Sequence, residues 1–209
     1  MLIFFKYILI VSLYIIPNNA LSLNSSAYLI TNSAVNLLDF EKAYSQFPSK
    51  NLNLSESDLH NQLLTVVNLN LITEGYSIAK EFLSINLLNQ EAWIVLLTYA
   101  KINNNLEIFK RYKEEISSSQ MEILNYIFFY ENEKIKEKNI NSQSIFEIVQ
   151  ASIFNDIEKV NYKFLLFYLS IANILDPNFN EAYYYKAQIY QQIKNYSKAE
   201  FYYKKINTS

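Results

Sequence analysis

The segment 176–206 reads DPNFNEAYYYKAQIYQQIKNYSKAEFYYKKI and decides the fold of this chain. In its first half Tyr183, Ala187 and Tyr190 recur at the three- and four-residue spacing of a helix face. The second half has a periodic run of its own, with Ala199 on its apolar side. Two antiparallel helices approach closely only where small residues meet. We therefore expect a helical hairpin with Ala187 and Ala199 at its crossing and tyrosines around them.

The order of residue types in this hairpin resembles the tetratricopeptide repeat. That pattern has an aromatic, a small residue and an aromatic on the first helix. An alanine and an aromatic four residues later follow on the second, here Ala199 and Tyr203, and a proline separates units, here Pro177. Lys186 departs from the pattern, which has leucine at that position. The resemblance implies an all-α fold, a TPR-like α-α superhelix of antiparallel helix pairs. It would span residues 23–209, follow an N-terminal signal helix and have its clearest repeat at 180–209.

Composition agrees with a helical fold and excludes several functional classes. The chain has 209 residues, of which 51% are hydrophobic. It contains only one glycine and three prolines, which are too few turn-forming residues for an all-β fold. The net charge of −2 comes without a long run of like charge, so the sequence gives no sign of nucleic-acid binding. Cysteine is absent, which excludes disulfides and thiol nucleophiles. A glycine-rich phosphate loop is excluded as well.

The N-terminus has the three parts of a secretory signal. A short region with one charge, Lys6, precedes an apolar run over 7–16 and a polar stretch that ends in small residues. Residues 1–22 are therefore predicted to be a signal peptide, cleaved after Ala20 or Ser22. The alternative is an uncleaved anchor formed by residues 2–16, because neither cleavage site is of the A-x-A type. This predicts export, to the periplasm of a Gram-negative bacterium, or inner-membrane anchoring if the segment is retained.

Earlier segments indicate further, more degenerate helix pairs. We expect two helices over 25–47, the second of which begins at Asp39. A further helix is expected to begin after a cap formed by residues 55–58. Gly75 is predicted to form a left-handed turn between two helices, and 103–105 another turn. Further helices are expected over 121–130, 145–154 and 160–175. The order of features resembles a group of exported bacterial tetratricopeptide-repeat proteins, which are generally longer, so the chain is expected to be truncated at its C-terminus.

No catalytic, cofactor-binding or metal-binding residue is predicted. His60 is the only histidine and cannot form a metal site or a catalytic triad without partners. Glu56 and Asp58 fit stabilisation of a helix N-terminus better than acid–base chemistry. The resemblance implies a scaffold that carries no catalytic residues.

The expected functional surface is the concave groove that the first helices of successive repeats line. Its candidates are mostly amides, hydroxyls and aromatics with little charge. They are Tyr28, Asn32, Leu64, Asn68, Ile94, Thr98, Lys101, Tyr184, Gln188 and Gln191. The sequence thus favours a non-enzymatic scaffold that binds a protein or peptide segment and needs no cofactor. The alternative is a membrane-tethered periplasmic assembly subunit, and a membrane is a partner only if the N-terminal segment is retained.

Overall fold

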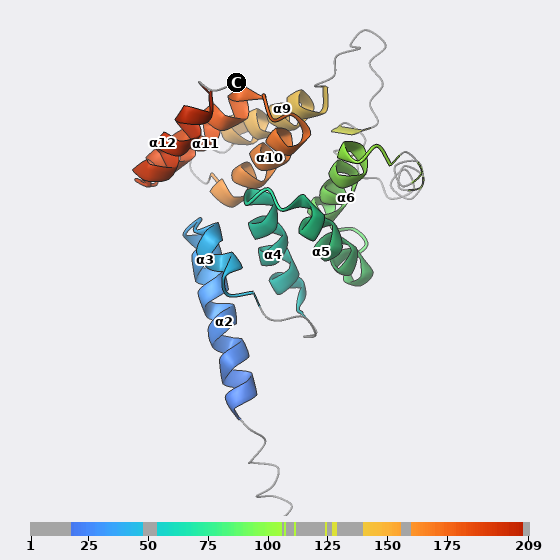
Figure 1. The fold of residues 1–209 in the computed structure, drawn as a ribbon, viewed down its shortest axis with the longest axis vertical. Coiled ribbons are helices and arrows are strands. Elements are labelled where there is room, and N and C mark those ends of the chain that lie inside the picture. The colour runs from blue at the N-terminus through green and yellow to red at the C-terminus, as the bar shows by residue number, and fades with distance from the viewer. Residues whose placement is uncertain are drawn as a thin grey trace, which may run out of the picture. The chain divides into compact units, whose positions relative to one another are not determined.

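The computed structural model describes residues 18–47, 54–105, 107, 111, 124, 127–128, 140–155 and 160–206. These residues form helices joined by short turns, and none of them lies in a β-strand (Figure 1). The all-α class predicted from the sequence is thereby confirmed for the described part of the chain. Internal contacts divide the chain into two units, Met1–Asn53 and Leu54–Ser209, and each is described by itself.

The first unit contains α2 (Asn18–Asn36) and α3 (Phe40–Tyr44). The predicted start at Asp39 is confirmed, because its Oδ1 accepts a hydrogen bond of 3.2 Å from the amide of Lys42 and caps α3. The helix before it begins at Asn18, earlier than the start expected near residue 25.

Most of the predicted signal segment, residues 1–17, lies outside the described part of the chain. Among the helices that are described, none combines the length and the apolar character needed to cross a bilayer.

The second unit contains seven described helices, most of which pack against their neighbours in sequence. The first group is α4 (Glu56–Asn68), α5 (Ile72–Ile85) and α6 (Gln90–Ile102). The second group is α9 (Ile140–Asn155), α10 (Tyr162–Leu175), α11 (Asn180–Gln192) and α12 (Tyr196–Ile206). Within these groups α5 packs against α4 and α6, and α11 packs against α10 and α12. The helix predicted over 121–130 falls mostly outside the described residues.

The start of α4 follows the predicted cap. The amide of Asp58 donates to Ser55 Oγ at 3.2 Å, and the amide of Ser55 donates to Asp58 Oδ2 at 3.0 Å. This reciprocal capping box satisfies two amides that the helix itself leaves without partners. Such caps stabilise a helix by about 1 kcal/mol. The carboxylate of Asp58 is thus used structurally, as the sequence suggested.

The glycine prediction was wrong. The turn between α4 and α5 uses Asn70, whose φ of 61° is left-handed, and the turn after α6 uses Asn104 with φ of 53°. Asparagine tolerates this conformation better than most residues. Gly75 instead lies inside α5, where it is buried. A Cβ there would stand 3.3 Å from Val95 Cγ1 of α6 and 3.5 Å from Val66 Cγ2 of α4, so the absent side chain permits close packing of three helices.

Helix α10 is the centre of the second unit. All residues from Leu165 to Asn173 are buried, which is the pattern of a helix covered on every side. It contacts α9 and α11, its neighbours in sequence, and also α4 and α6. Ser170 Oγ donates to Asn68 Oδ1 of α4 at 3.0 Å, which joins residues 102 positions apart.

These contacts depart from the expected stack. In a solenoid each repeat contacts only its neighbours along the chain. In this unit the apolar faces of α4 and α6 are covered by a helix from much later in the sequence. The helix that lies there is α10, which is almost wholly apolar. This position is favourable because every face of α10 is buried at once.

The pairing of α4 with α10 can be tested by cross-linking. The chain has no cysteine, so the double variant Asn68→Cys, Ser170→Cys carries only the two introduced thiols. We expect mild oxidation to link them as a disulfide within one molecule, because their native side chains meet at hydrogen-bond distance. The faster migration of the looped chain on a denaturing gel measures this. The single variants and the unfolded double variant serve as controls, and equal linking in denaturant would argue against the contact.

Candidate interaction surface

The predicted groove residues on α4 and α6 do not face an open groove. Leu64 is 3% exposed, and Ile94 and Thr98 are 0% exposed. The expectation that these three side chains line an accessible groove is therefore corrected. The physical reason is that α4 and α6 pack against both α5 and α10, so side chains at these positions are enclosed by neighbouring helices.

Asn68 and Lys101 are the other two predicted groove residues on α4 and α6. Asn68 uses its amide inside the protein, since Nδ2 donates to Leu64 O at 2.8 Å and Oδ1 accepts from Ser170. Lys101 is exposed at the surface, although desolvation at its amine lowers its pKa. Thr98 Oγ1 is a buried hydroxyl without a hydrogen-bond partner among the described residues. Because Leu64, Ile94 and Thr98 are buried, the five positions do not together present an accessible groove.

The two candidates on α2 belong to the first unit. Tyr28 is 38% exposed, and Asn32 is half-buried. They are four residues apart and so share one face of that helix. They are considered apart from the candidates of the second unit.

The three candidates on α11 form an exposed face together with Tyr203 of α12, and we call these four residues the amide face. Tyr184 is 46% exposed, Gln191 is exposed and Gln188 is half-buried. Their spacing of four and three residues puts them on one side of α11.

Hydrogen bonds hold the amide face in place. Gln188 Nε2 donates to the hydroxyl of Tyr184 at 2.7 Å, and the hydroxyl of Tyr203 donates to Gln191 Oε1 at 3.0 Å. The rings of Tyr184 and Tyr203 lie 6.2 Å apart in an edge-on arrangement. Within the described part of the chain, neither Gln188 Oε1 nor Gln191 Nε2 takes part in a hydrogen bond. The carbonyl of Gln188 and the amide nitrogen of Gln191 therefore keep hydrogen-bonding capacity on this aromatic face.

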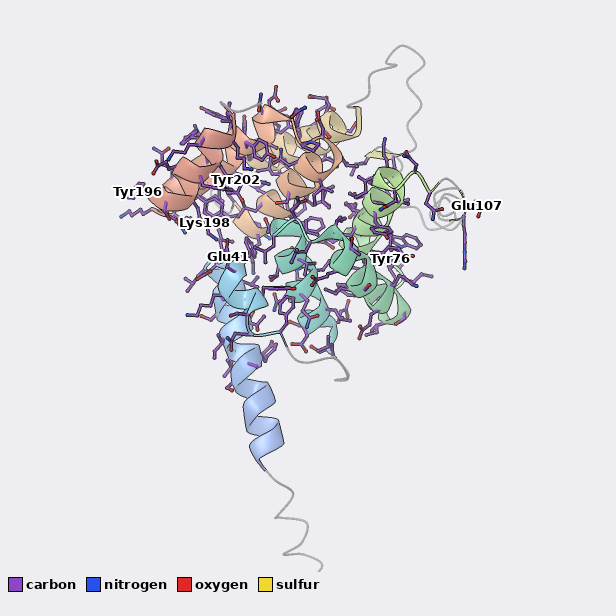
Figure 2. All side chains as sticks on the ribbon, viewed as in Figure 1. Glu41, Tyr76, Glu107, Tyr196, Lys198 and Tyr202 are labelled. Atoms are coloured by element: carbon purple, nitrogen blue, oxygen red, sulfur yellow. The ribbon has the colours of Figure 1, made fainter. Side chains whose placement is uncertain are left out.

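Beneath this face lies a stack of tyrosines that holds the hairpin together. The rings of Tyr190 and Tyr202 are 5.5 Å apart and nearly parallel, and those of Tyr183 and Tyr202 are 6.4 Å apart. Figure 2 labels Tyr202 and Lys198, both on α12. Ala187 and Ala199 are buried as predicted, with exposed fractions of 0% and 4%.

Lys186, which departs from the repeat pattern, is buried beside these tyrosines. It is 4% exposed, and its Nζ lies 5.3 Å from the centre of the Tyr202 ring and 5.8 Å from that of Tyr183. Lysine is rarely buried without an ionic partner. Burial lowers the pKa of Lys186 to about 7, since the charged amine loses its hydration. Burial, and secondarily the charge of Asp176, raises the pKa of Tyr183.

The remaining polar candidates play local roles. His60 is half-buried and packs edge-on against Phe82 with 6.5 Å between ring centres. Glu56 Oε1 accepts a hydrogen bond from Asn86 Nδ2 in the loop after α5. In the described ranges no three His, Cys, Asp or Glu side chains gather where they could hold a metal ion.

Comparison of the chain with protein-family models, with curated proteins and with solved structures gives no match. The described residues define an all-helical class, with a central buried helix and a hairpin of α11 and α12 that carries an exposed aromatic and amide face.

Proposed function

We propose that the chain is a non-enzymatic scaffold of tetratricopeptide-like helical hairpins that binds a protein or peptide segment on the amide face. The observation that carries this proposal is the preorganised set of Tyr184, Gln188 and Gln191. These are the three groove candidates of the repeat that best fits the tetratricopeptide pattern, and they share one exposed helix side.

The chemistry of the amide face suits an extended peptide. A glutamine carbonyl and a glutamine amide can bind the N–H and C=O groups of a peptide backbone. Tyrosine rings add contact area at a low cost in conformational entropy, because they have few rotatable bonds. The face carries no charge of its own, so we expect affinity to depend on backbone hydrogen bonds and apolar contacts and to change little with salt.

A displayed peptide library tests this proposal. Selection on the intact protein should enrich peptides that bind it, and the double variant Tyr184→Ala, Gln191→Ala should bind them at least about tenfold more weakly, because it loses one ring and one amide. Gln143→Ala, at an exposed glutamine of α9, is the matched control and should leave binding unchanged. Selection of no peptide, or equal binding by the double variant, would contradict the proposal.

A further inference from the structure

The end of α5 and the loop that joins it to α6 carry large apolar side chains that are exposed to solvent. Ile85, Leu87 and Leu88 are 56%, 62% and 69% exposed. Single exposed apolar residues are ordinary, but a contiguous group of large ones marks an interaction site. We call these three residues the leucine loop.

The leucine loop is held rigidly. Trp93 Nε1 donates to the carbonyl of Leu87 at 2.8 Å, and the amide of Leu88 donates to Asn86 Oδ1 at 3.1 Å. Asn86 Nδ2 in turn donates to Glu56 Oε1 of α4 at 2.5 Å. The loop conformation is therefore fixed before any partner binds, which lowers the entropy lost on association.

Acidic residues flank the leucine loop in the sequence. Glu56 is bonded to the loop itself, Glu81 lies one helical turn before Ile85, and Glu91 is in the first turn of α6. Residues 54–93 contain five carboxylates and one lysine, a net charge of −4 with histidine neutral. A partner for this surface needs an apolar centre with positive charges around it.

The terminal hairpin has a surface of that kind on α12. Phe201 is 54% exposed, and Lys204 and Lys205 follow it at three and four residues, on the same side of the helix. Lys205 Nζ lies 5.5 Å from the centre of the Phe201 ring. Tyr196, 65% exposed and labelled in Figure 2, begins the helix. We call Phe201, Lys204 and Lys205 the phenylalanine face.

The surroundings of the phenylalanine face are positive. Residues 180–206 contain five lysines and two glutamates, a net formal charge of +3. One of these lysines is the buried Lys186, so the exposed part of the hairpin carries about +2. Lys204 pairs with Glu200 of the same helix at 2.6 Å, an exposed contact of the kind that contributes little to stability.

We infer that the leucine loop of one copy of this chain docks on the phenylalanine face of a second copy. Each surface offers an apolar centre, and the charges around the two centres are opposite. Both surfaces are exposed within one molecule, so they are not satisfied by each other in the same copy. Because two different surfaces meet, the contact is heterologous and each dimer keeps one free surface of each kind, which permits further addition. This inference uses residues outside the amide face and does not depend on the proposed peptide binding.

Sedimentation velocity on the intact chain tests the inference. Over a concentration range of about a hundredfold we expect the mean mass to rise by mass action. Raising the salt concentration should weaken association, because the charges are at the surface. One double variant, Leu87→Ser with Leu88→Ser, removes the leucine loop. A second double variant, Phe201→Ser with Lys205→Glu, removes the phenylalanine face. Each double variant should remain monomeric. Because all four positions are exposed, circular dichroism should show an unchanged fold.

Mixing the two variants is the decisive arm. Each variant keeps one intact surface, so an equimolar mixture should form a dimer and nothing larger. Gln143→Ala should associate like the unaltered chain. The inference is overturned if the intact chain is monomeric throughout, if both variants associate like it, or if the mixture stays monomeric. Leucine-dependent binding to lipid vesicles without self-association would also overturn it.

Discussion

Replacing Lys186 by methionine is expected to raise the free energy of unfolding at pH 7 by about 2–4 kcal/mol. Methionine keeps the unbranched shape of the side chain and has no charge to desolvate. The gain is reduced by the loss of the contacts between the amine and the rings of Tyr183 and Tyr202. Urea denaturation of both proteins measures the difference.

The same substitution should remove a pH dependence. The pKa of Lys186 is about 7 in the folded protein and near its ordinary value of 10.5 in the unfolded chain. Between these values the unfolded chain binds a proton that the folded protein does not, so stability rises with pH, by at most about 1.4 kcal/mol per unit. The free-energy cost of burying the Lys186 amine is greatest at pH 7 and below, and it disappears above the pKa that Lys186 has in the unfolded chain.

The groups around Lys186 define the pH range in which its effect on stability can be measured apart from theirs. Its Nζ lies over the rings of Tyr183 and Tyr202. Beyond these rings Tyr202 stacks on Tyr190, Lys198 lies over Tyr190, and the charge of Asp176 acts on Tyr183. The raised pKa of Tyr183 keeps its phenol neutral between pH 7 and 9. The methionine variant retains all these groups, so the difference between the two profiles isolates Lys186.

Lys198→Met is the matched control, because its amine also lies over a tyrosine ring, 5.4 Å from the centre of Tyr190, at a half-buried position. It should change stability by less than about 1 kcal/mol and leave the pH profile intact. A Lys186→Met variant that is less stable and has the same pH profile as the unaltered chain would show that the amine is charged and held favourably by the rings.

Replacing Phe167 by alanine is expected to lower the free energy of unfolding by about 3–5 kcal/mol. Phe167 is 0% exposed and lies in α10, where its ring meets that of Tyr168 edge-on at 5.4 Å between centres. The helix around it packs against four others, so the cavity cannot close by a local shift. Chemical denaturation followed by circular dichroism measures the loss.

Phe201→Ala removes the same atoms from an exposed position and is the control for Phe167→Ala. At 54% exposure it should cost less than about 1 kcal/mol. Comparable losses in the two variants would contradict a central position for α10, since only a side chain enclosed by several helices creates a large cavity.

Local features of the fold could be predicted from the sequence. The caps at Asp39 and Ser55 and the turn at Asn104 depend on residues within a few positions of each other. The burial of Ala187 and Ala199 followed from helical spacing in the same way. Gly75 was misplaced because a glycine suits both a left-handed turn and a close helix contact, and only the packed neighbours distinguish the two.

The candidate site was predictable only where its neighbours lie close in sequence. Tyr184, Gln188 and Gln191 share a helix face by spacing alone, and the structure places them together. Leu64, Ile94 and Thr98 also follow a regular spacing, but their helices pack against others, among them α10, which begins 60 or more residues later. One signal was present: residues 164–175 contain no charge, which is typical of a helix that is buried on every face.

The sequence by itself determined that this protein is built of helices, because periodicity and capping act over one or two turns. Only the tertiary structure decided that α10 covers α4 and α6 and that Lys186 is buried among tyrosines. Many helices expose apolar faces of similar size, and the sequence does not say which will meet. That choice depends on the packing of side chains about a hundred residues apart, as in the contact of Asn68 with Ser170.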